Sequence, residues 1–450
     1  MTAYSYDPMN RLTSWTDALG HTTAYTYDGN GNVSSLQNPD GSMWAFVYDA
    51  YNRLVQETDP LGNSRSFTYD KNDNVLTYTD AVRNTTTYVY DPLGRCMRVI
   101  DALGNQTIMA YDASGNLTSI TDANANTTTY AYDADGQAIR RTYADGAAWT
   151  YAYDSVGNLA AQTDPNGNTT TFSYNRLNQL VAATYPDGST SHYTYDALGR
   201  LVTAANAHSA VTYSYDALSR PTQTSLDGRT LAYTYDARGN RLSLTSPEGA
   251  LLQYFYDEAG RVSRLRLPDG NSVQHSYDSL GQIVRVDYPS SSYATIAFHP
   301  SGRTNEIGRV RADGVELYAE VSVRDGVGNV ISRTTDVGTT TYTYDNLHQL
   351  VSAVLPGHGP ESFTYDGVGN RLTSADYTDW SYNARNQLIA YGGAVVTYDQ
   401  NGNRVSKTEG QGTTVYTYDW DNRLVRVDLP SGAYAIYRYD ALGRRTEQKR

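Results

Sequence analysis

Residues 193–200 read "YTYDALGR", and nearly the same eight letters recur as "YVYDPLGR" at 88–95, "YSYDALSR" at 213–220 and "YRYDALGR" at 437–444. A catalytic motif is needed once or twice in a chain, whereas a motif that returns throughout a chain indicates a repeat architecture. We therefore treat the Tyr that precedes Asp as the anchor of a repeat.

The spacing of these anchors defines the organisation of the chain. Anchors from Tyr6 to Tyr195 are 21 residues apart, and those that follow up to Tyr277 are 20 or 21 apart. The spacing is irregular over residues 299–400 and recovers over 401–445. The sequence thus predicts one array of about 22 units over residues 1–450, regular over 4–298 and 401–445, with no toxin or plug domain.

Composition agrees with an array and excludes several classes of protein. Of the 42 tyrosines, 20 are anchors and 12 lie two residues before an anchor, so the excess of Tyr belongs to the repeat. The single cysteine, Cys96, rules out an internal disulfide framework. A net charge of -13 argues against a nucleic-acid-binding surface. No apolar stretch approaches the roughly 18 residues of a spanning helix, and the N-terminus has no signal-peptide pattern, so we expect no membrane insertion.

Each repeat contains two strands and two turns. In "TTAYTYD" at 22–28 the side chains alternate between two faces, which is typical of a strand. The anchor turn, which starts at the Asp after the anchor, has Asp first and Gly fourth, as in a type I turn followed by a left-handed residue. A similar second turn closes the repeat. We expect the fold to depend on positions represented by Tyr27, Asp28, Tyr90, Asp91, Gly94, Tyr195, Asp196, Gly199, Tyr439, Asp440 and Gly443.

Short connections between all strands predict an all-β, antiparallel meander with no helix. Twisted open sheets rarely exceed about ten strands without curling, so a sheet of this length should coil and enclose a hollow. We expect the anchor tyrosines to form aromatic ladders between neighbouring repeats. Each repeat should contact mainly its two sequence neighbours.

The recurrent Tyr-Asp followed by Gly-Arg or Gly-Asn at 21-residue spacing resembles the YD repeats of Rhs proteins, over essentially residues 4–445. That family includes polymorphic toxins, the C components of Tc toxins, wall-associated contact-dependent toxins and teneurins. The resemblance implies a strand ribbon that spirals into a hollow cocoon, a beta-solenoid-like shell around a C-terminal toxin domain. It also implies a secreted, injected or cell-surface location.

The chain departs from the family pattern in one respect. Many members carry a plug region with "DPxGL"-like motifs and an aspartate self-cleavage activity, whereas "DPLG" at 59–62 is an ordinary repeat turn. We therefore expect a non-enzymatic shell segment of a longer protein. Its partners would be an enclosed toxin domain and, in addition, secretion machinery or cell-surface glycans.

No pattern in the sequence predicts a catalytic, cofactor or metal site. The seven histidines have no metal-ligand spacing, and no nucleophile or phosphate-loop motif is present. A D-x-N-x-N pattern resembles the start of a calcium loop but lacks the distal Glu, and Asp and Asn are also favoured in turns. This pattern occurs at 28–32, 70–74, 122–126, 164–168 and 399–403.

One alternative function remains open from the sequence. Aromatic side chains beside Asp and Asn can bind sugars, so the chain could be an extracellular adhesion module for glycans or proteins. The five tryptophans are spread along the array, which favours packing over a shared sugar platform.

Overall fold

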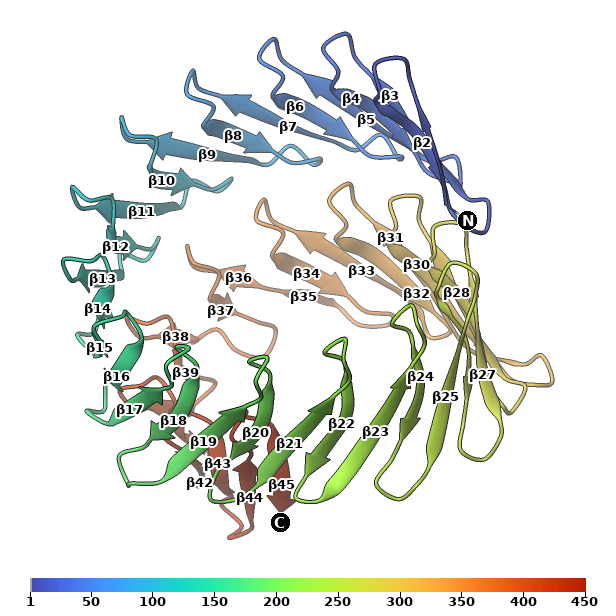
Figure 1. The fold of residues 1–450 in the computed structure, drawn as a ribbon. Coiled ribbons are helices and arrows are strands. Elements are labelled where there is room, and N and C mark those ends of the chain that lie inside the picture. The colour runs from blue at the N-terminus through green and yellow to red at the C-terminus, as the bar shows by residue number, and fades with distance from the viewer. Residues whose placement is uncertain (1) are drawn as a thin grey trace. The chain divides into compact units, whose positions relative to one another are not determined.

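A computed structural model describes residues 2–450 and contains 45 strands and no helix within that range (Figure 1). The described chain therefore holds no helix that could cross a membrane. Strands β1 to β35 belong to one sheet, β36 and β37 to a second, and β38 to β45 to a third. The pairing is antiparallel and joins strands that are consecutive in sequence, as the short turns predict.

In the regular part of the chain, strand lengths follow the repeat. The strand before each anchor turn usually has six residues and ends on the anchor, and the strand after it usually has five. The strands that end on an anchor are β1 (Ala3–Tyr6), β3 (Thr22–Tyr27), β5 (Met43–Tyr48), β7 (Ser64–Tyr69), β9 (Thr85–Tyr90), β11 (Gln106–Tyr111), β13 (Thr127–Tyr132), β15 (Ala148–Tyr153), β17 (Thr169–Tyr174), β19 (Thr190–Tyr195), β21 (Ala210–Tyr215), β23 (Arg229–Tyr235), β25 (Leu251–Tyr256), β27 (Ser272–Tyr277) and β29 (Tyr293–Phe298). The strands that follow the anchor turns are β2 (Leu12–Thr16), β4 (Val33–Gln37), β6 (Leu54–Thr58), β8 (Val75–Thr79), β10 (Cys96–Ile100), β12 (Leu117–Thr121), β14 (Ala138–Thr142), β16 (Leu159–Thr163), β18 (Leu180–Thr184), β20 (Leu201–Ala205), β22 (Pro221–Leu226), β24 (Arg241–Thr245), β26 (Val262–Arg266) and β28 (Ile283–Asp287).

The later strands are more variable, in the region where the anchor spacing fails. β31 extends to nine residues, whereas β36 and β38 have two each. The last four strands recover the regular pattern. The later strands are β30 (Thr304–Val310), β31 (Glu316–Arg324), β32 (Val330–Thr335), β33 (Gly338–Tyr344), β34 (Leu350–Val354), β35 (Pro360–Ser362), β36 (Thr364–Tyr365), β37 (Arg371–Thr373), β38 (Ser381–Tyr382), β39 (Leu388–Tyr391), β40 (Ala394–Tyr398), β41 (Arg404–Glu409), β42 (Gly412–Tyr418), β43 (Leu424–Asp428), β44 (Tyr434–Tyr439) and β45 (Arg445–Lys449).

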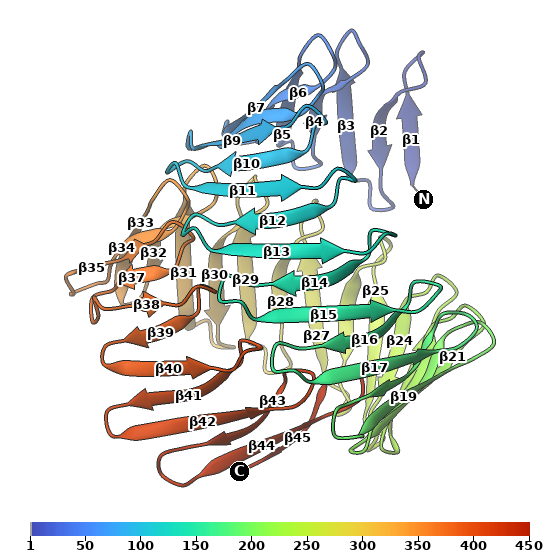
Figure 2. The same cartoon turned by 90° about the vertical axis from the view of Figure 1, so that its left-hand side faces the viewer.

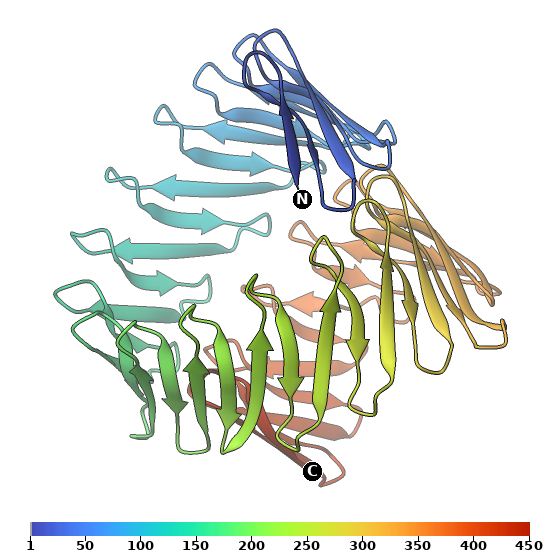
Figure 3. The same cartoon turned by 45° about the vertical axis from the view of Figure 1, so that its right-hand side comes forward.

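Each anchor turn introduces a bulge into its hairpin. Thr194 pairs with Thr203, but the next residue, Tyr195, pairs with Leu201, so the register shifts between Thr194 and Tyr195. The turn reaches this geometry because its fourth residue, Gly199, has a φ of 79°. The same shift recurs at other anchors, and the green hairpins in Figure 3 show the regular succession that results.

The chain divides into two compact units, each built from segments that are far apart in sequence. The first unit combines the segment ending at Gln106 with Tyr235–Ser243 and Ala250–Phe363, and the second combines Thr107–Thr234, Leu244–Gly249 and Thr364–Arg450. In the second unit we call Thr107–Thr234 the early segment and Thr364–Arg450 the late segment. Figure 2 shows β12 to β17 of the early segment and β39 to β45 of the late segment as two sets of successive strands.

The buried interior is thin and is made mostly of small side chains. Val211 and Ala204 have no exposed surface, and most of the other buried apolar residues are Ala or Val. Buried polar residues are nearly as numerous among the described residues and include Asp80, Asp164 and Asp440. Because apolar burial is small, polar contacts at the turns must contribute an unusually large part of the stability.

Candidate functional site

The anchor turn is a closed network of hydrogen bonds around one carboxylate. In the repeat quoted first, Oδ1 of Asp196 accepts from the backbone N–H of Leu198 at 2.9 Å and of Arg200 at 3.0 Å. Oδ2 of Asp196 accepts from Nε of Arg200 at 2.6 Å. The backbone carbonyl of Asp196 accepts from Gly199 N at 3.0 Å. All acceptor capacity of this Asp is directed at its own turn, which leaves little for a metal ion.

Two kinds of contact tie a repeat to the preceding one. Tyr195 donates from its hydroxyl to the carbonyl of Leu180 at 2.9 Å, fifteen residues earlier, at the start of the preceding repeat's second strand. The guanidinium of Arg200 lies 4.7 Å from the ring centre of the next anchor, Tyr215. The same stacking joins Arg11 to Tyr27, Arg53 to Tyr69, Arg261 to Tyr277 and Arg423 to Tyr439.

This stacking corrects the expectation of aromatic ladders between neighbouring anchors. In the repeats just named an Arg guanidinium covers the anchor ring, where we expected another aromatic ring. The physical reason is that the fifth residue of the turn is held over the next anchor by its own ion pair with Asp, as Arg200 is by Asp196. A cation placed over an aromatic face contributes about 0.5–1 kcal/mol at an exposed site.

The other repeat positions named from the sequence occupy the same network. Tyr27 donates to the carbonyl of Leu12 at 2.6 Å, and Asp28 accepts from the backbone N–H groups of Asn30 and Asn32, both at 2.9 Å. Asp91 accepts from Leu93 N and Arg95 N, Tyr439 donates to the carbonyl of Leu424, and Asp440 accepts from Leu442 N and Arg444 N. Gly94 and Gly443 have φ values of 78° and 79°, and Tyr90 ends β9.

Hydrogen bonding to the ionised form holds the pKa of the Asp28 and Asp196 carboxylates below the usual range. For Asp196 the largest cause is the bond from the backbone N–H of Arg200, followed in the same direction by its side chain. For Asp28 it is the side-chain amide of Asn32. Burial raises the pKa of the Tyr215 hydroxyl, so this group stays protonated and can donate a hydrogen bond.

In the second unit, turns of the early segment touch turns of the late segment in a row of contacts that we call the seam. Its most symmetric part joins 164–168 to 399–403. Asn401 donates from Nδ2 to Oδ2 of Asp164 at 2.7 Å, and Asn166 donates from Nδ2 to Oδ2 of Asp399 at 3.3 Å. Backbone bonds from Asn166 N to Asn401 Oδ1 at 3.2 Å and from Gln400 N to Asn166 Oδ1 at 3.1 Å complete the contact.

A second seam contact centres on Asn386. Its Nδ2 donates to Oδ2 of Asp122 at 2.7 Å, and its Oδ1 lies at 3.1 Å from Nδ2 of Asn126. Asn124 reaches across to Oδ2 of Asp366 at 2.8 Å. Three of the five D-x-N-x-N patterns therefore join segments distant in sequence. Those at 28–32 and 70–74 make turn contacts and contacts to a neighbouring repeat, from Asn32 to Asn52 of the next repeat and from Arg53 of the preceding repeat to Asp73.

The first unit contains a comparable contact built with histidine. His348 lies with Nε2 2.8 Å from Oδ2 of Asp80, a buried carboxylate 268 residues earlier in the chain. Its Nδ1 lies 3.1 Å from Nδ2 of Asn329. Because Asn Nδ2 can only donate, this arrangement fits a neutral imidazole that accepts at Nδ1 and donates at Nε2.

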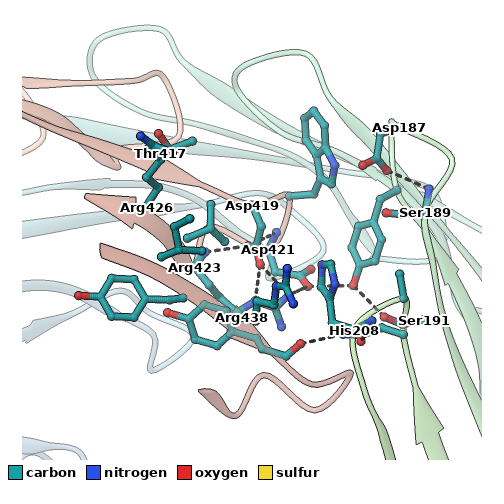
Figure 4. A pocket seen from close by; sticks show the side chains of 18 of the residues that line it. Asp187, Ser189, Ser191, His208, Thr417, Asp419, Asp421, Arg423, Arg426 and Arg438 are labelled. Atoms are coloured by element: carbon teal, nitrogen blue, oxygen red, sulfur yellow. Dashed lines mark hydrogen bonds and ion pairs between the residues drawn. The ribbon is translucent and has the colours of Figure 1, made fainter. Parts of the chain in front are cut away.

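A cavity of about 610 Å³ opens along the seam between 185–208 and 417–439 (Figure 4). Tyr185 donates to Oδ2 of Asp421 at 2.8 Å, and Arg423 lies 3.0 Å from Asp421 and 2.7 Å from Asp419. Burial raises the pKa of Tyr185 to about 12, and the bond to Asp421 acts in the same direction. The indole of Trp420 is 37% exposed beside the cavity.

The lining of this cavity offers polar recognition and no assembled catalytic group. Arg423 forms ion pairs with both Asp419 and Asp421, and Asp187 accepts from Ser189 N at 2.9 Å. Nowhere in residues 2–450 do three His, Cys, Asp or Glu side chains gather closely enough to hold a metal ion. The arrangement can bind a polar ligand with ring faces and hydroxyl or charged groups.

Sequence reasoning missed both the seam and this cavity. The available signal was a substitution within the repeat, because Tyr143 and Tyr185 stand where the second turns at 59, 80, 101, 122 and 164 begin with Asp, and Asp follows two residues later. Both tyrosines face the late segment, Tyr185 toward Asp421 and Tyr143 toward Arg385. The two tyrosines thus indicated turns with an additional contact, but no local pattern in the sequence identifies the partner residue.

Comparison with known proteins places this repeat in a family. The Teneurin YD-shell profile matches residues 104–220, 166–313 and 304–450, and the RHS Repeat profile matches 6–43, 48–85 and 69–106. The chain belongs to the Rhs and teneurin YD-repeat family. Its turn network is thus the three-dimensional form of the YD repeat.

Two similar relatives are bacterial toxins. The tRNA nuclease WapA of Bacillus subtilis (strain 168) is 34% identical over 117 residues, which are 23% of this chain and 5% of WapA. Double-stranded DNA deaminase toxin A of Burkholderia cenocepacia (strain H111) is 32% identical over 127 residues, 27% of this chain and 9% of the toxin. The matched YD-repeat region is therefore a small fraction of each relative.

Solved structures share the fold over nearly the whole chain. The TcdB2-TccC3-Cdc42 crystal structure covers 99% of this chain with a TM-score of 0.81 and 17% identity, and the chain covers 30% of it. A Photorhabdus luminescens Tc holotoxin pore gives a TM-score of 0.80 at 17% identity, with 99% and 29% covered. At this identity the likeness establishes the YD-shell fold alone.

Proposed function

We propose that residues 1–450 act as a single, non-enzymatic array in the wall of an Rhs-type shell that encloses a toxin domain before delivery. The observation that carries this proposal is the match of 99% of the chain to TccC3-containing structures, at a TM-score of 0.81. The Rhs and YD-repeat family is a structural one, and the recurrent Asp, Tyr and Gly positions bond to their own turns and neighbouring repeats. Chemistry would then reside in the enclosed domain.

The partner and the location follow from the same proposal. The relatives are toxins, named as a tRNA nuclease and a double-stranded DNA deaminase, so the enclosed partner is a toxin domain that acts after delivery. A shell of this kind works where toxins are secreted, injected or displayed on a cell surface. Secretion machinery is then a second partner, which meets the outside of the wall.

Activity assays on the purified chain test the absence of chemistry. At stoichiometric concentration it should leave tRNA and double-stranded DNA unchanged, as measured by gel electrophoresis and by sequencing for deamination. Expression of the same chain in the bacterial cytoplasm should not slow growth. Cleavage or deamination that survives further purification would contradict a purely structural role.

A second candidate function is glycan binding, and the cavity beside Trp420 favours it. An exposed indole with Tyr185, Tyr437 and the Asp187 carboxylate along one cavity combines a ring face with hydrogen-bonding groups, as sugar sites do. A glycan array probed with the chain should then give signals that Trp420→Ala removes. Trp15→Ala, in another slot of the repeat, is the matched control.

A further inference from the structure

A separate cavity of about 360 Å³ lies at the seam of the second unit, where Arg141, Tyr143 and Arg385 meet. Arg141, the fourth residue of β14, has its guanidinium 4.6 Å from the ring centre of Tyr143, and Arg385 from the late segment lies 4.5 Å from the same ring. Two guanidinium groups therefore share one aromatic ring across the seam. Two positive charges beside one ring favour the binding of an anion between them.

The protein supplies only part of that compensation. Asp145 forms an ion pair with Nε of Arg385 at 2.7 Å, but no carboxylate within residues 2–450 forms an ion pair with Arg141. Asp122, which also lines the cavity, is already hydrogen-bonded by the amides of Asn126 and Asn386. The turn that carries Arg385 begins with Asn383, where most anchor turns have Asp, so this turn brings no carboxylate of its own to the cavity.

Buried guanidinium donors point to a missing acceptor. The Arg385 side chain is 8% exposed, and its Nη1 donates to the carbonyl of Gln400 at 2.7 Å. Its Nη2 has no hydrogen-bond partner, and its contact with Asp145 through Nε lacks hydrogen-bond geometry. Nε of Arg141 is likewise buried and without a partner. Unsatisfied buried donors of charged groups are costly, so such sites are normally filled by an ion or water.

We propose that this cavity binds a small oxyanion, either a carboxylate or a phosphate group, between Arg141 and Arg385. Planar guanidinium forks match the oxygen geometry of both groups, and the volume accommodates a group of several non-hydrogen atoms. The bound anion would accept from Nε of Arg141 and Nη2 of Arg385. It would thereby link the early and late segments of the second unit, independently of the proposed shell function.

Isothermal titration of the purified chain with inorganic phosphate, and separately with acetate, tests this site at constant ionic strength in chloride buffer. Heat with phosphate alone assigns the phosphate class, and heat with acetate alone assigns the carboxylate class. Arg141→Gln should weaken binding at least about tenfold, because one charged hydrogen bond is lost. Arg264→Gln, at an exposed Arg over Phe255, should leave it unchanged.

A second variant keeps the test decisive if Arg141→Gln folds poorly. Tyr143→Asp introduces the residue that begins the second turns on either side, at Asp122 and Asp164, and places a carboxylate beside both guanidinium groups, so it should fold and should abolish anion binding. Hydrogen exchange of the wild-type chain with the anion should also slow at 141–145 and 383–387. No heat and no change in exchange with either anion, or equal binding by Tyr143→Asp, would overturn the proposal.

Discussion

The side-chain amide of Asn401 donates to the carboxylate of Asp164 over 2.7 Å, although 237 residues separate the two in sequence. Asn166 and Asp399 make the reciprocal bond, so two D-x-N-x-N turns hold one another with the same pair of groups. A pattern that resembles a calcium loop thus joins the early and late segments, whose strands at this point belong to different sheets. Its carboxylates are satisfied by amides, which need no metal.

The first prediction concerns the bond from Asn401 to Asp164. Asn401→Leu should lower the free energy of unfolding of the second unit by about 1–3 kcal/mol, because Asp164 is 7% exposed and loses a charged hydrogen bond. Urea unfolding measures the loss, and hydrogen exchange should quicken at both 164–168 and 399–403. Asn30→Leu is the matched control. Asn30 is likewise the third residue of a D-x-N-x-N pattern, but it is exposed and bonds to Asp28 through its backbone N–H alone. Equal losses from both substitutions would contradict the seam's role.

A second prediction concerns the left-handed turn residue. Gly199→Val should cost about 1–3 kcal/mol, because its φ is 79° and a β-branched residue resists that region. A Cβ at this position would also meet Nε2 of Gln179 at 3.1 Å. Gly20→Val is the control, with a φ of 87° and open space around the new side chain, and it should cost less in thermal unfolding.

A contact between distant segments extends the expected spread of that damage beyond the two neighbouring repeats. Tyr193, in the strand before Gly199, donates to the carbonyl of Ala441 at 2.9 Å. Hydrogen exchange after Gly199→Val should therefore rise at 439–444 as well as at 174–235, while the repeat at Tyr27 stays protected. A rise confined to 174–235 would restore the nearest-neighbour description.

A third prediction concerns how the free energy of unfolding changes at alkaline pH. The pKa of Tyr185 is raised to about 12 in the folded chain, mainly by burial, against about 10 when unfolded. Between these values the folded state binds more protons, so stability from this group is present below pH 10 and is lost as the pH rises through 12. Tyr185→Phe should cost about 1 kcal/mol at pH 8. The difference from wild type should shrink by pH 12, and a gap that is independent of pH would contradict the assignment.

A fourth prediction concerns how stability changes at acidic pH. The pKa of Asp196 is lowered by the bonds from Arg200, so its stabilising effect is present above about pH 4 and is lost as the pH falls further. The double variant Asp196→Asn, Arg200→Gln copies the natural turn of Asn175 and Gln179, which keeps the N–H bonds to an uncharged oxygen. Its melting temperature should fall less between pH 5 and pH 3 than that of wild type. An identical fall would show that this carboxylate does not contribute.

The sequence was sufficient for the features that each repeat specifies by itself. Period-two alternation, Asp at the start of the turn and Gly at its end predicted the hairpins, and the structure places Tyr195, Asp196 and Gly199 in them. The family was recognisable for the same reason, since its signature is the repeat. Local propensity and turn chemistry act over a few residues, and these are visible in any one unit.

Features that join distant segments could not be predicted in this way. The sequence around Tyr185 does not identify Asp421 as its partner, because their contact depends on the path of the chain over more than 200 residues. The seam and the two cavities depend on that geometry, whereas the stacking of Arg on anchor rings joins neighbouring repeats. The Tyr in place of Asp at 143 and 185 could only have indicated that those turns face something unusual.

Limited proteolysis most directly tests the central claim that this sheet is the wall of a shell around a toxin domain. In the protein as encoded in full, a domain enclosed by the repeats should resist trypsin far longer than the same domain expressed alone. A variant that combines Asn166→Leu and Asn401→Leu should shorten that protection by loosening the seam. Digestion of the domain at the same rate with and without the repeats would contradict the account.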